Sequence, residues 1–218
     1  MAHPRSSHVF DPARVARFER ENYEAYYRRR WARLLRASVA LVREAFGLGL
    51  IDGIHGAYLV ARAEIAFAPV RDNDVPRAVA YMRRFYRLLN SRLGVTIDLD
   101  RAARLDVNWW QVHRDHFADP DTGPLTLALA EWMSVVYDLA PERLMPSARW
   151  RAAGILCSDR WVRAGMPEPS ALLDEEEHAL TLSYQILRAA VEDQPGRENR
   201  KPRMPWWRAW TSRRHLGV

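Results

Sequence analysis

The stretch Asp74–Gly94, DVPRAVAYMRRFYRLLNSRLG, repeats apolar residues at the spacing of an α-helix and decides the fold class. Asp74 suits the N-cap of this helix, Pro76 suits its first turn, and Gly94 suits a left-handed C-terminal cap. The opposite face is arginine-rich, and we interpret it as solvated, with anion binding as the alternative. The face expected to point inward comprises Val75, Ala78, Val79, Met82, Phe85, Tyr86, Leu89 and Leu93.

The same helical period recurs along the chain, whereas alternating strand patterns and hairpin turns are scarce. We therefore predict an all-α protein: a single helical domain over residues 1–195, followed by a basic, tryptophan-rich tail over residues 196–218. Short linkers with proline, glycine and aspartate separate the helices. About seven helices are expected, over residues 12–46, 51–67, 75–93, 100–117, 124–138, 146–164 and 171–192.

The first expected helix carries two apolar stripes on nearly opposite faces. Val15 and Phe18 belong to one stripe, whereas Leu35 and Val42 belong to the other. One straight helix cannot turn both stripes to one core. Either the chain bends near Arg28–Arg30, or residues 13–27 form an arm whose tyrosines meet a partner subunit in a homo-oligomer.

The composition limits the chemistry of the predicted domain. Among the 218 residues Cys157 is the only cysteine, so no intrachain disulfide can form, and the N-terminus lacks the apolar run of a signal peptide. We expect a cytoplasmic protein. Arginine supplies every cation except Lys201, so the predicted domain has no lysine to form a Schiff base or to bind nucleotide phosphates. Pyridoxal-phosphate enzymes, P-loop hydrolases and protein kinases are therefore disfavoured.

The predicted tail carries a net charge of +6, which equals the net charge of the full chain. Residues 1–195 are therefore electrically balanced. The tail could contact an anionic membrane surface or nucleic acid, or its tryptophans could dock on the protein itself. The expected contact residues are Trp206, Trp207, Trp210, Arg213 and Arg214.

The expected helix 51–67 is apolar almost all round, and we expect it to be central. His55, Tyr58 and Arg62 nevertheless share an arc of about 60° on it, given 3.6 residues per turn. Glu64 points away from Arg62, so each charge needs its own partner. Arg62 either forms a salt bridge with another helix or holds a small anionic or carbonyl ligand.

The expected helix 100–117 places Asp106, Trp110 and His113 on one stripe. His113 and His116 are spaced so that both could reach one metal ion or a haem, although no matching second motif occurs. They could equally be structural histidines, or His113 could act as a general acid or base. No metal or cofactor is expected unless this pair binds one.

Two function classes follow from these observations. The first is a small-ligand- or partner-binding module with a polar pocket between the helices 51–67 and 100–117, lined by His55, Tyr58, Arg62, Trp110 and His113. The second is a haem- or metal-dependent oxidoreductase using His113 and His116. The small residues from Ala152 to Ser158 are expected to allow close helix packing rather than to form a site.

Overall fold

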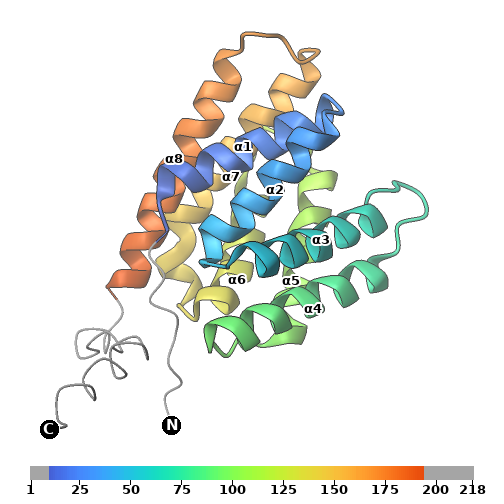
Figure 1. The fold of residues 1–218 in the computed structure, drawn as a ribbon. Coiled ribbons are helices and arrows are strands. Elements are labelled where there is room, and N and C mark those ends of the chain that lie inside the picture. The colour runs from blue at the N-terminus through green and yellow to red at the C-terminus, as the bar shows by residue number, and fades with distance from the viewer. Residues whose placement is uncertain (1–9, 194–218) are drawn as a thin grey trace, which may run out of the picture.

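Eight α-helices make up the regular structure of the part of the chain that the structure describes (Figure 1). The structure is a computed structural model that describes residues 10–193, and within that range it contains no strand. The all-α prediction is confirmed. The helices are α1 (Pro12–Tyr27), α2 (Trp31–Phe46), α3 (Leu50–Phe67), α4 (Val75–Leu93), α5 (Leu99–Asp115), α6 (Gly123–Tyr137), α7 (Pro141–Arg163) and α8 (Ala171–Glu192).

The predicted count of seven helices is wrong, because the segment 12–46 forms two helices. The chain reverses between Tyr27 and Trp31, where Arg29 adopts a left-handed backbone with φ 54°. Buried Glu24 stabilises this reversal because its carboxylate forms ion pairs with arginines from both sides of the turn. Of the two explanations for the opposed stripes, the bend is therefore present, and α1 packs within its own chain.

The helix termini follow the capping signals in the sequence. Asp11, Asp74 and Asp98 accept hydrogen bonds from backbone N–H groups of the first turns of α1, α4 and α5. Gly47 and Gly94 close α2 and α4 with φ of 68° and 63°. The largest boundary difference from the prediction is in α7, which begins at Pro141 rather than at residue 146, because Pro141 already lies in the first turn, where its missing N–H costs nothing.

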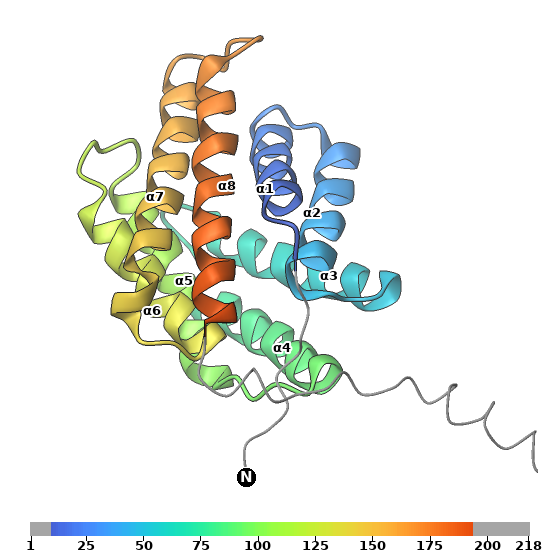
Figure 2. The same cartoon turned by 90° about the vertical axis from the view of Figure 1, so that its left-hand side faces the viewer.

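The helices form a closed ring. Each helix packs against the next one along the chain, and α8 returns to pack against α1. Figure 2 shows α1, α2, α7 and α8 running roughly side by side, while α3 and α4 lie across them as a hairpin. Contacts across the ring are few, so the inward faces of all eight helices surround a common space.

Two apolar clusters stabilise the two halves of the ring. One is built mainly from α6, α7 and α8 and includes Leu129, Met133 and Leu180. The other is built from α2 to α5 and includes Met82, Phe85 and Leu89. The halves are joined by α1 packing on α2 and by α5 packing on α6. The site described next lies where the two clusters meet.

Candidate functional site

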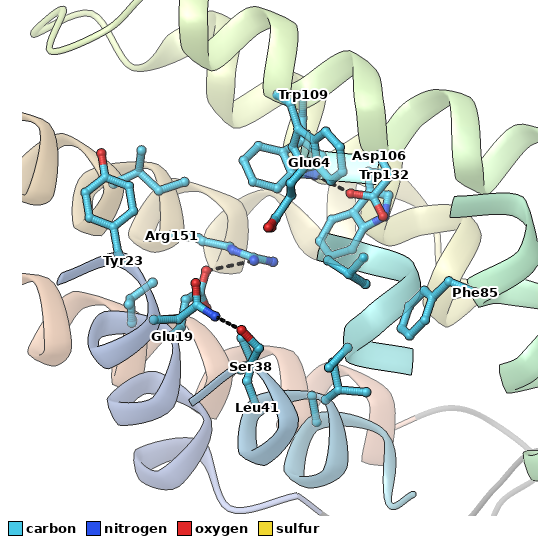
Figure 3. A pocket seen from close by; sticks show the side chains of 18 of the residues that line it. Glu19, Tyr23, Ser38, Leu41, Glu64, Phe85, Asp106, Trp109, Trp132 and Arg151 are labelled. Carbon is cyan, nitrogen blue, oxygen red and sulfur yellow. Dashed lines mark hydrogen bonds and ion pairs between the residues drawn. The ribbon is translucent and has the colours of Figure 1, made fainter. Parts of the chain in front are cut away.

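A cavity of about 260 Å³ occupies the centre of the ring, and every one of the eight helices contributes to its wall (Figure 3). Protein interiors are normally close-packed, with few voids larger than a water molecule. A central space of this size therefore needs a physical explanation. The wall is largely apolar and aromatic, with a few ionisable groups among the rings.

Arg151 of α7 is the cation of this wall, and it is already paired. Its Nη2 lies 2.8 Å from Oε1 of Glu19, and both side chains are largely buried. The Tyr184 hydroxyl donates a hydrogen bond to the other oxygen of Glu19. The guanidinium also lies over the rings of Trp109 and Trp132, 5.6 and 5.1 Å from their centroids. Burial favours loss of its charge, but Glu19 together with Tyr184 and Tyr137 outweighs this effect and raises the pKa of Arg151, so the guanidinium stays charged.

Glu64 of α3 presents its carboxyl group to the cavity. Figure 3 shows this carboxyl pointing into the open space, on the side opposite Ser38 and Leu41. Glu64 has an exposed side chain and is one of the residues that line the cavity. No hydrogen bond or ion pair joins it to any residue in the described range 10–193. Burial, followed by the charge of Asp106, raises the pKa of Glu64 to about 7.

Asp106 of α5 is fixed by a hydrogen-bond network. The Tyr86 hydroxyl donates to one carboxylate oxygen at 2.5 Å, and the Trp109 indole N–H donates to the other at 2.8 Å. The Trp132 indole N–H in turn donates to the Tyr86 oxygen at 2.7 Å. Burial raises the pKa of Asp106 to about 6, and these donors limit the rise because they stabilise the ionised form.

Like Glu64 and Asp106, Glu176 of α8 is a carboxyl group of the cavity wall that forms no ion pair with a described residue. Its side chain is 2% exposed, and its Oε2 atom has no hydrogen-bond partner among the described residues. Burial, followed by the charge of Glu19, raises its pKa well above the ordinary value. A buried polar atom without a partner costs about 1–3 kcal/mol, so its position beside a cavity suggests an absent partner.

Two of the predicted ligand-binding residues, Trp110 and His113, line the cavity. His113 Nε2 lies 3.0 Å from each carboxylate oxygen of buried Asp159. Asp159 also accepts hydrogen bonds from the Tyr23 hydroxyl and from the backbone N–H of Ala118. His113 is therefore held by the protein itself, and its ring forms part of the wall.

The structure places the other three predicted ligand-binding residues outside the cavity. His55 and Tyr58 are exposed on the outer face of α3, and Arg62 lies on the same face. Arg62 forms no salt bridge with a described residue. It donates a hydrogen bond to the Tyr58 hydroxyl at 3.1 Å and lies over the Tyr81 ring.

The small residues of α3 explain this orientation. Gly56 packs so closely against Val42 and Phe85 that an added Cβ would lie 3.0 and 3.2 Å from them, and Ala57 and Ala63 are also buried. Leu59 and Phe67 are buried on the same side, whereas Ile51, Ile54 and Ile65 remain exposed. The expectation that this helix is central is therefore wrong: α3 turns one face to the ring and the other to solvent.

His113 and His116 have different partners. His116 Nδ1 lies 3.4 Å from Asp119 on a partly exposed surface, whereas His113 contacts buried Asp159. Within residues 10–193 no group of three or more His, Cys, Asp or Glu side chains is arranged to hold a metal ion. The geometry does not bring this pair to a common ligand.

The tail contacts predicted at Trp206, Trp207, Trp210, Arg213 and Arg214 lie outside the described residues.

In the described range, none of the helices combines the length and apolar character needed to cross a bilayer.

The fold and site together define an all-α protein with a ring of eight helices around an acidic and aromatic cavity. Comparison of the chain with protein-family models, with curated proteins and with solved structures gave no significant match.

Sequence reasoning singled out Glu64 and Asp106 but did not assign either of them to the pocket, and it missed Glu19, Arg151 and Glu176. A usable signal was present for Glu64, because a carboxyl inside an apolar helix needs a partner or a cavity. Glu19, Arg151 and Glu176 lie on helices with many other charges, so nothing in the sequence distinguished them.

Proposed function

We propose that this protein binds a small organic molecule in the central cavity. The observation that carries the proposal is that polar atoms without a protein partner face a preformed space. Glu176 Oε2 and Arg151 Nε are buried and unpartnered among the described residues, and the Glu64 carboxyl is open to the cavity. Binding sites commonly combine an apolar wall with a few such polar groups.

The size of the cavity limits the ligand. Cavities for drug-sized ligands span about 300–1,000 Å³, so a space of about 260 Å³ suits a smaller molecule. Three aromatic residues, Trp109, Trp132 and Phe85, supply flat apolar surface for its body. The charged groups would then fix its orientation.

The proposal is tested by filling the cavity. Ala61→Phe places a ring on the cavity side of α3, one turn from Glu64, whereas Ile65→Phe adds bulk on the exposed side of the same helix. Small aromatic and aliphatic fragments are screened against the full chain by thermal shift and by tryptophan fluorescence. We expect fragments that raise the melting temperature of the wild type and of Ile65→Phe, but not that of Ala61→Phe.

Two results would refute the proposal. One is that no fragment stabilises the wild-type protein. The other is that the stabilising fragments act equally on the folded Ala61→Phe variant, since they would then bind elsewhere.

A further inference from the structure

We infer that the ligand of the cavity is a small organic cation, an ammonium group carried on an apolar or aromatic body, with Glu64 as its counter-ion. This inference rests on the proposed function and adds the chemical class of the ligand. Four features of the wall support it: the balance of charges, the open carboxyl of Glu64, the unpartnered Glu176 and the aromatic surface.

Acidic groups in the wall outnumber the basic groups available to them. Arg151 is matched by Glu19 at 2.8 Å, and His113 is matched by Asp159 at 3.0 Å. Three further carboxyl groups line the same space and form no ion pair with a described residue. These are Glu64, Asp106 and Glu176.

Glu64 is the carboxyl that a ligand can reach most directly. Both oxygens of Asp106 already accept hydrogen bonds from Tyr86 and Trp109, whereas the Glu64 carboxyl is open to the cavity. An ammonium beside Glu64 would gain a charge-assisted hydrogen bond. It would also reduce the repulsion between Glu64 and Asp106, which contributes to the raised pKa of Glu64.

Glu176 is an independent indication that a donor is missing from the cavity. Its carboxyl is buried on α8, which α1 and α2 separate from α3 in the ring, and one oxygen has no partner among the described residues. A ligand N–H group would satisfy this acceptor. The structure therefore offers unpartnered acceptors to a ligand on two sides.

The aromatic surface of the wall suits a cation and its apolar body. Arg151 shows that this environment accommodates positive charge, since its guanidinium lies over the rings of Trp109, Trp132 and Tyr184. The remaining open side of the space is bounded by Leu41 and Phe85 (Figure 3). An apolar ligand body would contact these two side chains.

An anionic ligand is disfavoured by the same geometry. An anion could accept a hydrogen bond from Arg151 Nε, but Glu19 already pairs with this guanidinium, and the anion would share the cavity with the carboxyl groups of Glu64, Asp106 and Glu176. A neutral ligand would leave the carboxyl groups unmatched, and it would not distinguish Glu64 from glutamine. These alternatives give different outcomes in one experiment.

The experiment compares three compounds of similar shape and different charge: 2-phenylethylamine, 2-phenylethanol and phenylacetate. Their dissociation constants for the full chain are measured by isothermal titration calorimetry at slightly alkaline pH, where Glu64 is mostly ionised. We expect the amine to bind at least about tenfold more tightly than the alcohol, and phenylacetate more weakly than either.

The variants assign this preference to one residue. Glu64→Gln should weaken amine binding about tenfold or more and change alcohol binding by no more than about twofold, because only the ion pair is lost. Glu131→Gln removes an exposed carboxyl on α6, outside the cavity wall, and should leave all three affinities unchanged. Glu64→Gln removes a poorly hydrated charge, so it is expected to fold.

Three results would overturn the inference: binding of the alcohol or phenylacetate as tightly as the amine, an amine affinity that survives Glu64→Gln, or no binding of the amine. The charge comparison in the wild type is decisive even if the variant fails to fold. If neutral or anionic ligands bind the wild type but not Ala61→Phe, the proposed function stands. Only the inference that the ligand is a cation is then refuted.

Discussion

At the scale of single residues, Tyr86 connects two polar groups that the apolar cluster would otherwise leave unmatched. It donates to Asp106 and accepts from the Trp132 indole, and all three side chains are buried. Burial, followed by the charge of Asp106, raises the pKa of Tyr86 well above its usual value, so the phenol keeps the proton that it donates. This network fixes one wall of the cavity.

We predict that Tyr86→Phe destabilises the protein by about 2–4 kcal/mol, because it leaves an indole N–H and a carboxylate oxygen buried without a partner. The free energy of unfolding is measured by urea titration. Tyr58→Phe is the matched control, since its exposed hydroxyl contacts only Arg62, and it should change stability by less than about 0.5 kcal/mol. Equal effects of the two variants would contradict the importance of the network.

At the scale of helices, α7 and α8 pack along each other more extensively than any other pair in the described ring. The Ser147 hydroxyl on α7 donates to the backbone oxygen of Ser183 on α8 at 2.9 Å. A Cβ at Gly154 would lie 3.1 Å from Leu180 Cγ and 3.4 Å from the backbone oxygen of Glu176. The small residues predicted to allow close packing therefore do so at Gly154, and the cavity residues Arg151 and Glu176 lie on these two helices.

We predict that Gly154→Leu costs about 2 kcal/mol or more, because the added side chain must separate α7 from α8. Ala189→Leu adds a side chain of the same size at an exposed position of α8. Its free energy of unfolding should stay within about 0.5 kcal/mol of the wild-type value. Thermal and urea unfolding of both variants check this prediction. If Gly154→Leu matched the control, the close contact would have no energetic consequence.

At the scale of the whole molecule, the environment of the central carboxyl groups favours their protonated forms. The folded protein therefore binds protons that the unfolded chain releases. For Glu64 the pKa is raised from 4.5 to about 7, and for Asp106 from 3.8 to about 6. Between about pH 4 and pH 7 the folded state holds more protons than the unfolded state, so these two groups make the free energy of unfolding fall as pH rises.

We predict that this loss of stability between pH 5 and pH 8 is smaller in Glu64→Gln than in the wild type, because glutamine has no proton to lose. Urea unfolding of both proteins across this range, without ligand, gives the difference directly, and contributions from titrating groups that do not interact with Glu64 cancel in it. Glu131→Gln should follow the wild-type curve. Parallel curves for wild type and Glu64→Gln would show that Glu64 titrates normally.

Local patterns in the sequence were enough to predict the helical class and most helix boundaries to within a few residues, because capping residues, proline, glycine and the apolar period act over short distances along the chain. It also indicated the bend near Arg28–Arg30, since two stripes on one segment cannot face one core. Trp110 and His113 share one stripe of α5, and both line the cavity; their role as ligand-binding residues stays a prediction.

Only the tertiary structure decided which face of α3 points inward. That helix is apolar almost all round, so its own periodicity could not separate the face with Glu64 from the face with Arg62. The choice follows from contacts with α2 and α4, where small residues allow close approach. The cavity likewise exists because α8 closes the ring on α1, a long-range contact that no local pattern encodes.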